Sequence, residues 1–181
     1  QVFDKLRGNI PRLVTASTAA EDSTYTNEVT GYTNTGIQFG PDSGGYVNYS
    51  GLTYGHMFFQ RAPGFFDEVC YTETGSATTV THNLTVPPEL IIFKNRNTAG
   101  YDWITVYPKD VGGYLSGAIN KTYSMGYITY SNGGSPLYLS SAPTSTSFDI
   151  TAQYSINKPS DGIVAYLFAS CPGVSKVGSY T

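Results

Sequence analysis

The side chains between Tyr101 and Tyr138 are the ones whose types best suit a binding chemistry. Tyr and Trp rings stack on the apolar faces of pyranose sugars, and Asn and Ser side chains hydrogen-bond to the sugar hydroxyls. The same residues can instead pack between subunits or between consecutive units, and we favour this second interpretation because such contacts need amphipathic surfaces. The candidate residues for a glycan or subunit contact are Tyr101, Trp103, Tyr114, Asn120, Tyr123, Tyr127, Tyr130 and Asn132.

Residues that could support catalysis are few. His56 and His82 are the two histidines of the chain, and neither lies in a metal-binding or triad motif. We expect His82, which precedes a turn at a strand end, to have a structural role. Paired carboxylates can cleave glycosidic bonds, but Asp67 and Glu68 are adjacent and point to opposite faces of an expected strand. We therefore expect no enzyme, no cofactor and no metal site.

Charge and composition argue against further classes of protein. The formal net charge is −3 and the ten Lys and Arg residues are scattered, which argues against nucleic-acid binding. No apolar stretch approaches the roughly 20 residues of a membrane span, so we expect no membrane insertion. The glycine-rich residues 40–45 lack the ligands of a phosphate or calcium loop and predict a turn. Cys70 and Cys171 are expected to be buried free thiols.

An internal repeat determines how these residues are positioned. Residues 35–72 align without a gap on residues 144–181, at a constant offset of 109 residues. Eight of the 38 aligned positions are identical, including the pairs Pro63-Gly64 and Pro172-Gly173. A repeat of this size is typical of a segment of a tandem array.

The composition and the spacing of apolar residues predict an all-β fold. Charged residues make up 13% of the chain, whereas it contains 22 Thr, 18 Ser, 20 Gly and 16 Tyr, which suit strands and turns. Short extended runs separated by turns predict antiparallel β-sandwich or jelly-roll units in tandem. The expected strands are residues 12–15, 36–39, 46–48, 54–60, 68–72, 78–82, 89–94, 102–107, 137–139, 147–151 and 163–169. We expect residues 89–94 to form a central strand, and residues 108–136 to be mostly loop or short edge strands.

The repeat divides the chain into three parts. Residues 1–66 are expected to be the C-terminal part of a first unit, and residues 67–175 a complete β-sandwich unit. Residues 176–181 are expected to start a further unit or to form a terminal strand. The Pro-Gly linkers are too short for a flexible tether, so neighbouring units should have a defined relation.

Several separated motifs resemble a repeat domain of tail-fibre and other virion structural proteins of bacteriophages, especially marine and cyanobacterial phages. The similar stretches are APGFFDEVCYT (62–72), HNLTVPPELIIFKNR (82–96), WITVY (103–107), APTSTSF (142–148) and VAYLFASCPGVSKVGSY (164–180). One departure is Thr85, which stands where the family often has Gly.

The resemblance implies a structural component of a phage virion appendage, located on the extracellular particle. It also implies partners: other copies of the chain, with a trimer expected because fibres are commonly trimeric, and other virion proteins. The alternative is a receptor-binding module that recognises host surface polysaccharide through the Tyr- and Asn-rich loops. The family supplies no catalytic motif to carry over.

Overall fold

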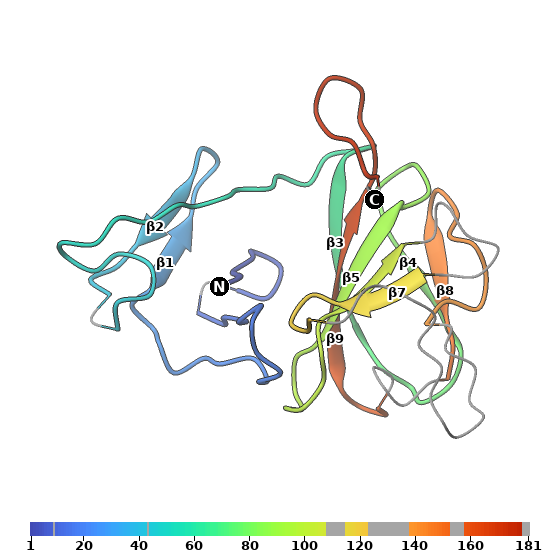
Figure 1. Ribbon diagram of the computed structural model, residues 1–181, viewed down its shortest axis with the longest axis horizontal. Coiled ribbons are helices and arrows are strands. Elements are labelled where there is room, and N and C mark those ends of the chain that lie inside the picture. The colour runs from blue at the N-terminus through green and yellow to red at the C-terminus, as the bar shows by residue number, and fades with distance from the viewer. Residues whose placement is uncertain (9, 43, 108–114, 123–137, 153–157, 179–181) are drawn as a thin grey trace.

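The structure is a computed structural model that describes residues 1–8, 10–42, 44–107, 115–122, 138–152 and 158–178 (Figure 1). These residues form nine strands and no helix. The strand pairings between them are antiparallel. The prediction of an all-β fold is confirmed.

A five-stranded sheet is the largest element of the fold. Its strands, in sheet order, are β3 (Phe66–Thr72), β9 (Gly162–Phe168), β5 (Leu90–Asn95), β6 (Ile104–Tyr107) and β7 (Leu115–Ala118). β9 pairs with β3 along one side and with β5 along the other. β5 is itself flanked by β9 and β6, which confirms the central position predicted from its apolar run.

A two-stranded sheet packs on one face of the large sheet. It consists of β4 (Thr78–Thr81) and β8 (Ser147–Ile150). One core cluster contains buried side chains of both sheets, because alternate residues of each strand point to the same face. Its members include Val80, Phe148 and Ile150 from the small sheet and Ile91, Phe93, Ile163 and Leu167 from the large one. The two sheets form a β-sandwich-like arrangement, and the described residues contain one such arrangement.

Residues 1–22 cover the opposite face of the large sheet (Figure 1). Leu13 is fully buried in a second cluster with Trp103 and Tyr166. The Trp103 indole Nε1 donates a hydrogen bond to the Val14 carbonyl at 2.9 Å. Lys94 of β5 lies on the same face, where its Nζ donates to the Tyr101 carbonyl at 2.8 Å and to the Thr18 carbonyl at 3.4 Å. The large sheet is therefore buried on both faces.

A separate hairpin lies beyond the N-terminal segment, away from the large sheet (Figure 1). It consists of β1 (Val29–Tyr32) and β2 (Ile37–Phe39). Arg12 links this region to the N-terminal segment through a 2.6 Å ion pair with Glu28. The Arg12 guanidinium also lies 3.6 Å from the ring centroid of Tyr25 and 4.5 Å from that of Tyr46, which are cation–π distances.

Six strands expected in the complete unit are confirmed to within two residues at each end: β3, β4, β5, β6, β8 and β9. β7 is a short edge strand, as expected for residues 108–136, most of which lie outside the described residues. The strand at 36–39 is confirmed as β2, but its partner β1 was not predicted. The expected strand at 54–60 was wrong, because these residues pair with no other strand among the described residues. Arg12 and Leu13 of the strand expected at 12–15, and Leu139 of the one expected at 137–139, form isolated bridges only; residue 137 lies outside the described residues. The division of the chain into repeat units stays a prediction.

The expected strand at residues 46–48 was wrong. The buried Asp42 carboxylate accepts hydrogen bonds from the amides of Gly44, Tyr46, Val47 and Asn48, so the backbone bends around it. Burial raises the pKa of Asp42, but these four amide bonds outweigh it and hold the pKa below its usual value. The turn predicted for this glycine-rich segment is confirmed by the same contacts.

Candidate interaction surfaces

Residues 53–59 form an exposed apolar segment that belongs to none of the nine strands; we call it the linker strand because of its extended course and its position in the repeat. They run extended from the hairpin to the start of β3 (Figure 1). Met57, Phe58 and Phe59 are 86%, 66% and 52% exposed. Between the described residues, no backbone–backbone hydrogen bond reaches the linker strand. An extended segment with free amides and carbonyls and exposed apolar side chains is a template for pairing with another strand.

The linker strand stands at the position of β9 in the internal repeat. At the offset of 109 residues, residues 53–59 coincide with the bounds of β9. In β9 the alternate side chains enter the two core clusters, and Ile163, Ala165 and Leu167 are fully buried. The two copies of this strand therefore have opposite environments: one is exposed, and the other is central in a sheet.

The Pro-Gly turns that follow the two strands have the same backbone structure. Gly64 and Gly173 have φ angles of 71° and 77°, which glycine adopts readily because it has no Cβ. Three backbone hydrogen bonds of the first turn recur in the second at the equivalent residues. In the first turn, the Ala62 amide donates to the Phe66 carbonyl, and the amides of Phe65 and Phe66 donate to the Ala62 carbonyl. In the second, the Cys171 amide donates to the Ser175 carbonyl, and the amides of Val174 and Ser175 donate to the Cys171 carbonyl.

Aromatic contacts hold the two ends of the linker strand. The Phe59 ring centroid lies 5.6 Å from that of Phe168, which is its own counterpart in the repeat. At the other end, His56 stacks on Phe39 of β2 with ring centroids 4.6 Å apart. The counterpart of Phe39 is Phe148, which lies in the core between the two sheets. The linker strand is thus anchored to the large sheet and to the hairpin, while Met57 and Phe58 between them stay exposed.

A network of charged side chains fixes the N-terminal segment to the large sheet. The Arg7 guanidinium is buried and pairs with Asp4 and, at 3.0 Å, with Glu21. Arg96 forms a second ion pair with Glu21, with 2.8 Å between Nε and the carboxylate. The Tyr166 hydroxyl of β9 donates to the Asp4 carboxylate at 2.7 Å. Because a buried charge is costly without its partner, this network favours one placement of the segment on the sheet.

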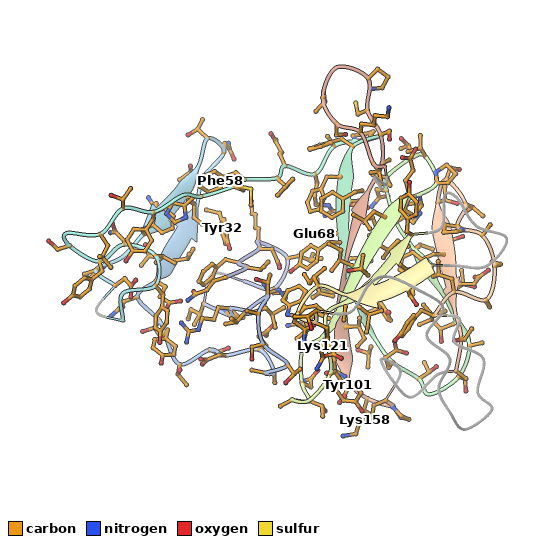
Figure 2. The ribbon with its side chains drawn as sticks, viewed as in Figure 1. Tyr32, Phe58, Glu68, Tyr101, Lys121 and Lys158 are labelled. Carbon is orange, nitrogen blue, oxygen red and sulfur yellow. The ribbon has the colours of Figure 1, made fainter. Side chains whose placement is uncertain are left out.

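Glu68 of β3 is the described carboxyl group on this face with a marked pKa shift. Figure 2 shows its side chain on the side of the sheet that faces the N-terminal segment. Burial, followed by the nearby charge of Asp4, raises the pKa of Glu68 to about 7, while Arg61 and Arg7 act in the opposite direction. Such a group can exchange a proton near neutral pH. The side chain is only 7% exposed, so we interpret it as a determinant of stability.

Three of the eight candidate contact residues lie in the described chain. Trp103 is 1% exposed, so it is a core residue whose ring offers no face to a sugar or to a neighbouring subunit. This corrects its assignment to a contact surface. Asn120 accepts a hydrogen bond from the Trp103 amide at 2.9 Å and donates to Asp102 at 2.8 Å, so its side chain ties two parts of the chain together. Tyr101 is half-buried and lies near Lys121, far from Phe58 (Figure 2). Tyr114, Tyr123, Tyr127, Tyr130 and Asn132 lie outside the described residues.

The histidines and cysteines have structural environments. His82 is buried, and its Nδ1 accepts the Leu84 amide of the following turn at 3.2 Å. Burial lowers the pKa of His82, which favours the neutral ring. Cys70 and Cys171 are free and half-buried, and burial raises the pKa of Cys70 to about 11, so its thiol is unreactive at neutral pH. Within the described ranges, no group of three or more His, Cys, Asp or Glu side chains is arranged to hold a metal ion.

The part of the chain that the structure describes contains no helix long and apolar enough to cross a membrane. The fold and these surfaces define an all-β, sandwich-like domain with a strand-and-turn repeat. A family model for a domain of unknown function, DUF7483, matches residues 59–181, which is more than half of the chain. The chain belongs to this family. The matched segment contains both Pro-Gly turns and all of the five-stranded sheet. No curated protein matches the chain, and no solved structure matches it.

The sequence could have indicated the linker strand as a contact surface. Residues 54–60 were expected to form a strand, and the repeat alignment places them on the apolar β9. The exposure of Met57 and Phe58 depends on which strands lie nearby, and no local pattern of residues encodes that. The Tyr- and Asn-rich loops stand out by composition, whereas the linker strand has only three consecutive large apolar residues, Met57 to Phe59.

Proposed function

We propose that the chain is a structural component of a phage virion appendage, such as a tail fibre, a spike or a capsid fibre. In this proposal, β-sandwich units follow one another along the polypeptide. The observation that carries it is the repetition of the Pro-Gly turn with the same hydrogen bonds, because a repeated joint is what a tandem array needs. The virion context comes from the resemblance of the motifs at 62–72, 82–96 and 164–180 to phage virion proteins.

The joint at Pro63-Gly64 has the contacts of a rigid connection. The Gly64 amide donates to the Leu84 carbonyl at 2.6 Å, which fixes the turn to the complete unit. Arg61, just before the turn, pairs with the buried carboxylate of Asp67 in β3. Phe59 packs against Phe66 and Phe168 at the same place. A shaft that transmits force needs such fixed joints, whereas flexible tethers are rich in Gly and Ser and make few contacts.

The receptor-binding alternative has no described contact in its favour. Trp103 is buried, and the amide of Asn120 is engaged within the chain. A surface that recognises polysaccharide needs exposed rings with free hydrogen-bonding groups beside them. Binding to polysaccharide is therefore measured as a second outcome of the experiment below.

Analysis of purified phage particles tests the proposal. We expect mass spectrometry to find peptides of this chain in the particles, and antibodies against the chain to label a fibre, spike or other appendage in electron micrographs. Detection of the protein in infected cells but not in particles would contradict the proposal. Specific binding of the isolated chain to a glycan array would favour the receptor-binding alternative, and uniform absence of binding would leave the structural role.

A further inference from the structure

We infer that the linker strand is the interface through which this part of the chain joins another unit of the same β fold. In that unit, residues 53–59 take the place that β9 has in the described sheet, between one strand like β3 and one strand like β5. The inference rests on the tandem organisation proposed for the chain and specifies which segment joins the units. The occupant of the surface is therefore a sheet that lacks its own central strand.

The backbone of the linker strand fits this position. β9 forms antiparallel pairs on both sides, with Phe66–Thr72 of β3 and with Leu90–Asn95 of β5. The linker strand is already extended, and between the described residues its backbone makes no hydrogen bond to other backbone groups. It also leads into the same Pro-Gly turn as β9 does. Two rows of backbone donors and acceptors are thus available for two neighbouring strands.

The side chains of the linker strand divide between two faces as those of β9 do. Phe58 is equivalent to Leu167, which is fully buried between the two sheets. Met57 is equivalent to Tyr166, which lies in the cluster on the opposite face. Burial of Met57 and Phe58, now 86% and 66% exposed, supplies an apolar driving force on both faces.

The hairpin that precedes the linker strand fits as well. β2 ends at Phe39, which is equivalent to Phe148 of β8, and Phe148 lies in the core between the sheets. The stacking of His56 on Phe39 at 4.6 Å joins two residues whose counterparts, Ala165 and Phe148, share that core cluster. The hairpin and the linker strand together therefore contain the counterparts of core residues from both sheets of the sandwich.

One position predicts how the partner sheet differs from the described one. His56 stands where β9 has Ala165, and the cross-strand neighbour of Ala165 in β5 is Phe93. A His beside a Phe at this buried site would overpack the core. The partner of the linker strand should therefore carry a side chain smaller than Phe at the position of Phe93.

An extended chain tests the inference. A second copy of residues 66–109, which contains β3 to β6, is joined ahead of Gln1 so that the 109-residue spacing is kept. Two versions are made, one with Phe and one with the Phe93→Ala change in the added copy. Hydrogen exchange is measured by mass spectrometry at low protein concentration, with the 181-residue chain as the reference. We expect the amides of residues 54–59 to exchange about 100-fold more slowly in the extended chain, with the larger effect in the Phe93→Ala version.

Two variants with matched exposure provide the control. Phe58→Asp in the extended chain should abolish the protection, because a charge at the position of Leu167 is buried without a partner. Leu52→Asp should leave it unchanged, since Leu52 is 58% exposed and its counterpart in the repeat is already an acid, Asp161.

Fast exchange at residues 54–59 in both extended versions, with β9 still protected, would overturn the inference. Protection in the 181-residue chain that increases with protein concentration would also overturn it, because the occupant would then be a second copy of the chain. Neither result depends on whether the protein is found in phage particles. Failure of the inference is thus distinguishable from failure of the proposed function.

Discussion

The linker strand and β9 occupy the same position of the repeat, and they differ in almost every tertiary contact. β9 is paired on both sides and buried on both faces, whereas the linker strand is exposed and pairs with no strand in the part of the chain that the structure describes. The Pro-Gly turns that follow them, in contrast, have the same three hydrogen bonds. The turn is determined by a few local residues, so it forms in both places. A strand needs neighbours distant in sequence, and only one of the two copies has them among the described residues.

The largest difference should appear when equivalent side chains are removed from the two strands. Leu167→Ala deletes a fully buried side chain and should lower the free energy of unfolding by about 3 kcal/mol, from lost burial and the cavity left behind. Phe58→Ala, at the equivalent position, should change it by less than about 0.5 kcal/mol because the side chain is 66% exposed. Urea unfolding of both variants measures the two values. Equal losses at the two positions would contradict the contrast between the strands.

A smaller effect should appear in the pH dependence of stability, because burial raises the pKa of Glu68 on β3, whereas amide hydrogen bonds lower that of Asp42, which follows β2. The pKa of Glu68 is about 7 in the folded protein, against an ordinary value of 4.5. Between these values the folded state binds the proton more tightly than the unfolded chain does. The contribution of Glu68 to stability is therefore greatest below about pH 4.5 and is lost as the pH rises through 7.

The Glu68→Gln variant isolates this contribution. We expect it to be more stable than the parent chain by about 2 kcal/mol at pH 8, and to match it at pH 4. Burial also raises the pKa of Glu73 to about 7, but Glu73 is present in both proteins and cancels in the difference. Urea unfolding across this pH range is the measurement. A difference between the two proteins that stays constant from pH 4 to pH 8 would show that Glu68 titrates normally.

The smallest effect should come from the two turn glycines. Alanine at Gly64 or Gly173 meets no atom within 4 Å but must adopt a positive φ, which costs about 1 kcal/mol. The Gly64 turn leads into β3 and is bonded to Leu84, so its strain should lower the unfolding free energy by about that amount. The Gly173 turn follows the last strand, and its strain can be relieved by local opening with little global loss. Thermal unfolding of both variants compares them, and a larger loss for Gly173→Ala would oppose this ranking.

Much of the fold follows from the sequence because strands and turns have local signatures. The apolar run of residues 90–93 predicted a central strand, and the repeated Pro-Gly pairs predicted the turns. The strand predicted at residues 46–48 is a bend. Four backbone amides donate to the carboxylate of Asp42, and the local pattern of residues did not indicate these contacts. Thr85, where the resemblance noted in the sequence would place Gly, has a φ of 68°. The departure from Gly thus marks a position with a left-handed backbone.

The candidate site was harder to predict, because exposure depends on tertiary neighbours. Trp103 alternates with apolar residues in a β pattern, which places it on a face of a sheet but does not say what covers that face. Residues 1–22 cover it, and their apolar spacing gave no indication of this role. The exposure of Met57 and Phe58 likewise follows from the absence of flanking strands among the described residues.

Hydrogen exchange of the 181-residue chain at low concentration tests the central contrast most directly. We expect the amides of residues 54–59 to exchange within about ten-fold of the rates of an unfolded peptide, because they have no backbone partner among the described residues. The amides of residues 163–168 should be protected by a factor of about 10⁴ or more, since they open only with the whole sheet. Comparable protection of the two segments in dilute solution would contradict the claim that one strand of the repeat has its neighbours and the other does not.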